Sequence, residues 1–132
     1  ETLKAETGFS FDNIDLDSIF NNFKEKTTSQ YYEIYTDNNS GKKLACVYMF
    51  RDTNPECLFI TATAADGISS EDFVKALGYG NANYSEFVSG NITVGLWHYA
   101  EHGYYECYIE EASWVENGVR YSIYQFFNLD KI

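Results

Sequence analysis

Residues 91–127 are NITVGLWHYAEHGYYECYIEEASWVENGVRYSIYQFF, and this stretch decides the fold class. Within it, residues 91–99, 103–114 and 119–127 alternate between apolar and polar side chains, which is the period-two pattern of a β-strand. The short segments AEHG and VENG separate these runs, and Asn117-Gly118 is a strong signal for a tight hairpin turn. The stretch therefore predicts consecutive antiparallel strands.

More strands are predicted earlier in the chain because aromatic and β-branched residues gather in runs bounded by turn residues. These runs are SQYYEIYT (29–36), KLACVYMF (43–50) and CLFITATA (57–64). The second and third runs are apolar on both faces, so they suit the centre of a sheet. The segments DNNSG and RDTNPE between them predict turns. SEFVSG, residues 85–90, predicts only a short and weak strand.

Helices are predicted in three places. The clearest covers residues 69–78, which have a serine at the N-cap, acidic residues in the first turn and Gly78 at the end. Residues 1–7 favour a helix that ends at Gly8, and mixed helical spacing predicts a short helix over 15–25.

These elements predict an α+β fold, with a mostly antiparallel, five- to six-stranded meandering sheet and two or three helices packed on one face. A chain of 132 residues is expected to form a single domain over 1–132. Its expected parts are an N-terminal helical segment (1–27), a sheet region (29–64), a helix (69–78) and C-terminal strands (85–127).

The composition is strongly acidic, with 20 Asp and Glu against 9 Lys and Arg and a net charge of −11. Such a charge repels phosphate backbones and anionic membrane surfaces, which argues against nucleic acid as a partner. No run of about 18 apolar residues is present, so no membrane span is predicted within the chain. The abrupt start ETLKAETGF suggests that a signal or anchor segment precedes it.

The three cysteines do not form a C-x-x-C pair, so the sequence predicts neither a zinc knuckle nor a thioredoxin-like site. The predicted hairpin places Phe50 near Cys57 and Cys46 near Thr61, which separates the first two sulfurs too far for a disulfide. We expect Cys46, Cys57 and Cys107 to be buried, reduced thiols.

The segment HYAEH, residues 98–102, has the spacing H-x-x-E-H of inverted zinc peptidases. Two histidines four residues apart face one metal only on a helix, whereas this segment is predicted to be strand, turn and strand. On a tight hairpin His98 and His102 could still approach each other, with Glu101, Glu106 or Glu110 as a third ligand. Cys107 and His98 form a second candidate pair, one step out of the expected register. The sequence predicts no catalytic, metal or cofactor site here, and a small hydrolase built on these residues stays an alternative.

The candidate interaction face combines acidic and tyrosine side chains of the C-terminal strands. Tyrosine offers a large contact area at a low entropic cost, so such a face suits protein recognition. The alternative is an ordinary solvated sheet face. The predicted members are Tyr104, Glu106, Tyr108, Glu110 and Tyr124.

The segments ETGFSFDNID, NITVGLW and EASWVENGVRYSIY resemble an uncharacterised extracytoplasmic domain family of Firmicutes. The closing strand pair carries the resemblance, at Ala112, Trp114, Gly118, Tyr121, Ser122 and Ile123. Members of this family are secreted or membrane-anchored, and some are attached to anti-sigma factors. The resemblance implies an extracellular or cell-surface location and assigns no activity or cofactor.

We therefore expect a non-enzymatic extracytoplasmic interaction or sensing module that binds a protein, a peptide or a cell-wall component. Two alternatives remain open at this stage. One is the small hydrolase that uses His98, Glu101 and His102 or Cys107. The other is an acidic inhibitor or immunity-type protein for a basic partner. The net charge of −11 favours this alternative.

Overall fold

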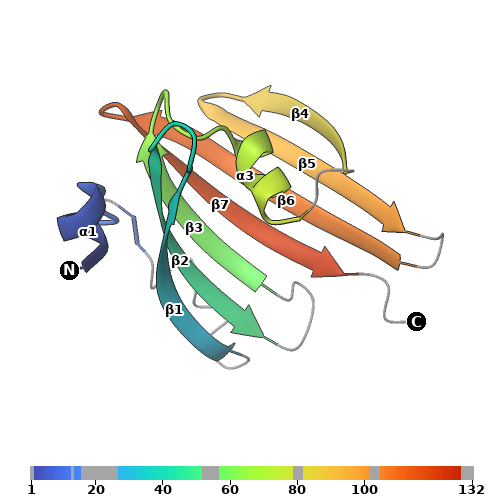
Figure 1. Cartoon of the computed structure of the whole chain (residues 1–132). Coiled ribbons are helices and arrows are strands. Elements are labelled where there is room, and N and C mark those ends of the chain that lie inside the picture. The colour runs from blue at the N-terminus through green and yellow to red at the C-terminus, as the bar shows by residue number, and fades with distance from the viewer. Residues whose placement is uncertain are drawn as a thin grey trace.

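A computed structural model of the chain describes residues 2–12, 14–15, 27–51, 57–78, 82–101 and 105–128. The described residues form a twisted antiparallel sheet with two short helices, α1 (Thr2–Thr7) and α3 (Ser70–Ala76) (Figure 1). The strands are β1 (Thr27–Thr36), β2 (Lys43–Arg51), β3 (Cys57–Ala64), β4 (Asn83–Ser89), β5 (Ile92–Glu101), β6 (Tyr105–Glu116) and β7 (Val119–Asn128). The helix predicted over 15–25 lies almost wholly outside the described residues.

The sheet has seven strands in the order β1-β2-β3-β7-β6-β5-β4, and all neighbours are antiparallel. The mostly antiparallel sheet is confirmed, but the predicted count of five or six strands was too low. The weakly predicted segment at 85–90 begins earlier, at Asn83, and pairs with β5 along its whole length. The sheet is also not one meander. Two meanders, β1–β3 and β4–β7, meet where β3 pairs with β7.

The two faces of the sheet are covered by different parts of the chain: α3 packs on one face, and the segment that follows α1 packs on the other. Of the helices predicted to pack on one face, α3 is the one that the described residues place there. Alternate residues of β3 explain the division, because successive side chains of a strand point to opposite faces. Phe59 packs in one cluster with Phe73 and Val74 of α3. Leu58 and Ile60 pack in the other cluster, with Phe11 and Ile14 of the N-terminal segment.

Aromatic rings dominate the core on the α3 side. Phe59 stacks on Tyr124 with ring centroids 4.7 Å apart, and Phe126 lies 5.1 Å away on the same side. Phe73 of α3 meets Phe59 edge-on at 5.9 Å. These contacts hold α3 against the centre of the sheet, where β3 and β7 pair.

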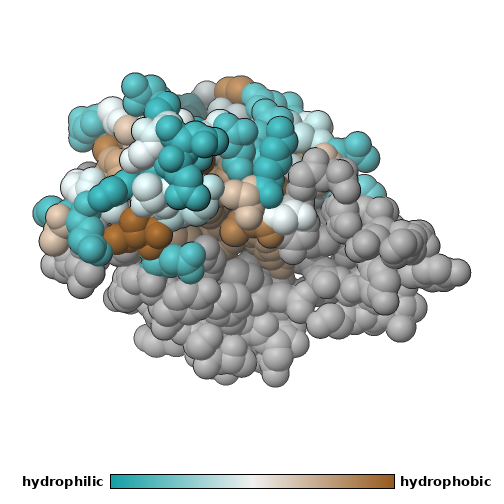
Figure 2. Space-filling view, viewed as in Figure 1, coloured by the Kyte–Doolittle hydropathy of each residue, from teal (hydrophilic) through white to brown (hydrophobic). Residues whose placement is uncertain are grey.

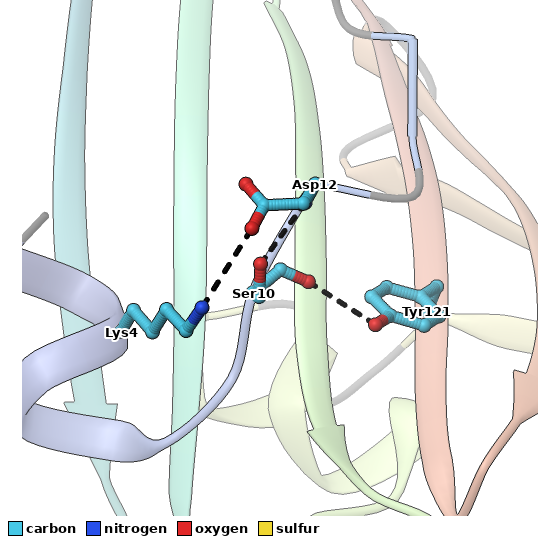
Figure 3. A network of polar contacts seen from close by, with 4 residues as sticks. All are labelled: Lys4, Ser10, Asp12 and Tyr121. Carbon is cyan, nitrogen blue, oxygen red and sulfur yellow. Dashed lines mark hydrogen bonds and ion pairs between the residues drawn. The ribbon is translucent and has the colours of Figure 1, made fainter.

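The N-terminal segment is fastened to the opposite face by polar contacts (Figure 3). The hydroxyl of Tyr121 donates a hydrogen bond of 3.1 Å to the carbonyl oxygen of Ser10, and Lys4 approaches Asp12 at 3.7 Å. Helix α1 ends as predicted at Gly8, whose φ of 80° a glycine adopts without steric cost. Lys43 of β2 donates to the carbonyl oxygen of Glu6 at 3.4 Å, which ties the end of α1 to the sheet.

The predicted hairpin registers are confirmed. Cys46 lies opposite Thr61 and Phe50 opposite Cys57, and Cys46 is buried. Asn117 and Gly118 both have positive φ values, 53° and 76°, as a two-residue type I′ turn requires. Within the described ranges, neither helix has the length and hydropathy needed to cross a bilayer.

Candidate functional site

The HYAEH segment begins in an extended strand. His98 lies within β5 and Glu101 is its last residue, while His102 lies outside the described residues. The helical spacing that the zinc-peptidase motif needs is therefore not met over 98–101. The Cα partner of His98 is Tyr108 and that of Cys107 is Tyr99, so His98 and Cys107 are one residue out of register.

The predicted interaction face is only partly described. Glu110 is exposed on β6. Tyr104 lies outside the described residues, and the side chains of Glu106 and Tyr108 are not among those that the structure describes. Tyr124 was assigned to this face wrongly, because only 1% of it is exposed.

The turn at Asn117-Gly118 explains the error for Tyr124. It pairs Glu116 with Val119, which brings Tyr124 opposite Glu111. Residues that are directly opposite share one face of a sheet, so Tyr124 points to the α3 side and Glu110 to the other side. Counting outward from this turn in the sequence would have given the correct face.

A buried polar cluster lies where α3 crosses β6 and β7. Glu111 is only 4% exposed, and the Ser70 hydroxyl donates a hydrogen bond of 2.6 Å to its Oε2. Burial raises the pKa of Tyr124 well above its ordinary value, and the charge of Glu111 adds to this effect. The Arg120 guanidinium donates to the carbonyl oxygen of Ile68 in the loop before α3. These contacts fasten the start of α3 to the sheet.

A polar cleft of about 440 Å³ lies between the β1–β2 turn and the start of α3. Some of its polar side chains already hydrogen-bond to the segments that form the cleft. The Asp37 carboxylate accepts hydrogen bonds from the Ser40 hydroxyl at 2.5 Å and from its amide at 3.0 Å, and these bonds lower the pKa of Asp37. Lys42 Nζ donates to the carbonyl oxygen of Asp66 at 2.7 Å. Asp37 and Lys42 therefore already have partners within the walls of the cleft.

The edge strand β4 is the most unusual surface that the structure describes. It ends the strand order, and all of its residues except Tyr84 are exposed. Phe87 is 54% exposed and Val88 is 67% exposed, and these neighbours point to opposite faces of the sheet. Around this edge, the described surface on the side drawn in Figure 2 is mostly hydrophilic, with hydrophobic residues in small separate patches.

Apolar side chains continue inward from Phe87 along one row of the sheet. Phe87 lies opposite Val94, Val94 opposite Ala112, and Ala112 opposite Ile123. The last three are half-buried, and Ile123 packs against the core beneath the N-terminal segment. Phe87 is therefore the exposed end of a row that begins in the core.

On the α3 side, Tyr84 lies across the strand next to β4. A Cβ atom at Gly95 would come within 3.1 Å of the Tyr84 ring, so the glycine leaves the space that the ring fills. The ring also packs on Trp97, with centroids 4.6 Å apart. Its hydroxyl donates a hydrogen bond of 2.5 Å to the Glu86 carboxylate.

Negative charge surrounds the Tyr84 hydroxyl. Burial raises its pKa above the ordinary value, and the hydrogen bond to Glu86 and the charges of Glu111 and Glu71 raise it further. Residues 76–119, which include β4, β5 and β6, contain six glutamates and no lysine or arginine. These three strands are therefore acidic and contain no lysine or arginine of their own.

Comparison of the chain with protein-family models, with curated proteins and with solved structures found no match. The resemblance to an extracytoplasmic family of Firmicutes thus stays a prediction. Among the described residues, no group of three or more His, Cys, Asp or Glu side chains is arranged to hold a metal ion.

The edge strand β4 could not be recognised as a site from the alternation of apolar and polar residues. Phe87 and Val88 are adjacent apolar residues, so the segment lacks the pattern of a strand with one buried face. The adjacency was itself the available signal, since a strand with apolar residues on both faces is either central or incompletely covered.

Proposed function

We propose that this chain is a non-enzymatic interaction module that binds another polypeptide at the β4 edge of its sheet. The observation that carries the proposal is the exposure of Phe87 and Val88 on a strand at the end of the sheet. Natural proteins usually protect such edges with lysine, proline, a bulge or a covering segment. In β4 the one charged residue is Glu86, and the strand contains no proline.

The hydrolase alternative receives less support from the geometry. The pairing of β5 with β6 places Tyr108 opposite His98 and leaves Cys107 opposite Tyr99. A nucleophile and its base must lie within hydrogen-bonding reach of each other. The offset register does not favour such a pair.

An acidic inhibitor or immunity-type protein is the second candidate, and the net charge of −11 favours it. Complementary charge speeds the encounter of two proteins and makes their binding sensitive to salt. Such an inhibitor would be a special case of the proposed module, with one tightly bound basic partner. We further propose an extracellular or cell-surface location, which rests on the resemblance of the closing strand pair.

The test is selection of binders from a random peptide display library with the whole chain as bait. A Phe87→Asp variant replaces the exposed apolar ring with a charge, so selected peptides should bind it at least about tenfold more weakly. The control is Val115→Asp, because Val115 is a similarly exposed apolar residue (56%) near the C-terminal end of β6, two strands away from β4 in the sheet. Peptides that bind both variants as well as the unaltered chain would contradict the proposal.

A further inference from the structure

We infer that β4 takes up an added antiparallel strand from a basic partner, with a lysine or arginine of that partner opposite Glu86. This inference rests on the proposed function, since it assumes that the β4 edge is the binding site. It adds the mode of binding and the chemical character of the partner.

The backbone supplies the first part of the argument. Alternate residues of an edge strand direct their N–H and C=O groups away from the sheet, where an extended segment can pair with them. β4 pairs with β5 over its seven residues without a register shift, so its outer edge is regular. Strand addition to such an edge gives affinity through the main chain and specificity through alternate side chains.

The second part concerns the side chains on each face. Tyr84, Glu86 and Val88 point to the α3 side, whereas Ser85 and Phe87 point to the other side. An added strand would therefore meet an apolar residue, an acid and an aromatic ring in succession on the α3 side. On the other side it would meet Phe87, the exposed end of the apolar row.

The negative charge at and around Glu86 favours a lysine or arginine at the central position of the added strand. The Glu86 side chain is exposed, and its carboxylate is held by the hydroxyl of Tyr84. Glu71 and Glu111 add negative charge at the same hydroxyl. Neither β4 nor its neighbour β5 contains a lysine or arginine, so these two strands supply no such cation to Glu86, whereas an added strand can.

The same charge disfavours a second copy of this chain as the occupant. Glu86 is the middle residue of β4, so full antiparallel overlap of two β4 strands places Glu86 beside its own copy. Like charges directly opposite each other destabilise a strand pair. Each copy also carries a net charge of −11.

The probe is the heptapeptide acetyl-Thr-Val-Val-Lys-Thr-Tyr-Thr-amide, which places valine opposite Val88 and Phe87 and lysine opposite Glu86. Its control has glutamate in place of the lysine. Affinities for the whole chain are measured by titration with NMR detection. We expect the lysine peptide to bind about fivefold more tightly. The Glu86→Lys variant should reverse the preference, whereas Glu110→Lys on β6 should leave it unchanged.

Backbone methylation then separates strand addition from simple charge attraction. Two further peptides carry N-methyl groups on one or the other set of alternate amides. Strand addition predicts that one set abolishes binding while the other set leaves it intact, and that the outward amides of β4 exchange more slowly in the complex.

The outcomes distinguish this inference from the proposed function. Equal loss with both methylated peptides, or no reversal with Glu86→Lys, would overturn the inference. If the heptapeptides do not bind, yet library-selected peptides still depend on Phe87, then strand addition by a basic segment is wrong and the β4 edge remains the binding site. If selected peptides are also indifferent to Phe87, both proposals fail.

Discussion

Gly95 lies beneath the ring of Tyr84, and a single added methyl group would disturb that contact. The Cβ of an alanine would approach Tyr84 at 3.1 Å and Trp97 at 3.2 Å, closer than ordinary van der Waals contact. We expect Gly95→Ala to destabilise the fold by about 1 kcal/mol, because the two rings must shift. Guanidinium unfolding monitored by tryptophan fluorescence measures this loss. Ser85→Ala, at an exposed position of β4, is the control, and equal stability of the two variants would contradict the packing argument.

Individual residues were predictable where local rules apply. The position of Cys46 opposite Thr61 followed from the length of a hairpin loop. The burial of Glu111 could not be foreseen, because charged residues are rarely buried without a partner. Its partner Ser70 comes from a helix that is distant in the sequence, so the contact exists only once α3 has packed.

Helix α3 is short, and a single side chain, that of Ser69, caps its first turn. The Ser69 hydroxyl accepts a hydrogen bond of 3.1 Å from the amide of Asp72, which satisfies one of the otherwise unpaired groups at a helix start. We expect Ser69→Ala to cost about 1 kcal/mol of the free energy of unfolding. Urea unfolding curves provide the measurement. The matched control is Ser69→Asp, which retains an acceptor at the cap; a loss as large as that of alanine would count against this role.

A strand or helix was easier to predict when one of its faces is buried and the other is exposed to solvent. Strand β6 has a buried face and a more exposed face near the turn, and its alternation was recognisable. The helix α3 was recognisable from the serine at its N-cap, Ser69, and from Gly78 just after its end. β4 gave a weak signal, because a strand exposed on nearly all sides is under little pressure to alternate.

At the scale of the whole molecule, buried tyrosines couple stability to alkaline pH. Burial raises the pKa of Tyr84, Tyr121 and Tyr124 in the folded state, whereas the unfolded chain loses these protons near the ordinary value of about 10. Above that pH the unfolded state binds fewer protons than the folded state, so stability falls as the pH rises. Below about 10 this contribution is fully present.

Urea unfolding between pH 8 and 11 tests this dependence. We expect the midpoint to fall above pH 10 in the unaltered chain, and less steeply in Tyr124→Phe, which cannot ionise. The variant should be less stable than the unaltered chain at pH 8, because Tyr124 lies in a polar cluster with Glu111 and Ser70. Curves that remain parallel across the whole pH range would show that Tyr124 is not a source of the effect.

The arrangement of the whole sheet was the least predictable feature. Periodicity identifies strands, but it does not identify which strands lie side by side when they are far apart in the sequence. The pairing of Ile60 with Ile123 joins the two meanders, and no turn links them. It is fixed by burial on both faces at once, under α3 on one side and under the N-terminal segment on the other.

The pairing of β3 with β7 also determines how late in synthesis β3 can find its partner. β3 ends at Ala64, yet its partner β7 begins at Val119, so a growing chain finishes β3 long before β7 has been made. Throughout that interval β3, whose residues 58–63 are buried in the finished protein, has only β2 beside it and can pair with another chain. Contacts between segments so far apart form slowly, and exposed strands of this kind aggregate. We therefore expect the growing chain to be most prone to aggregation while β3 still lacks its partner β7.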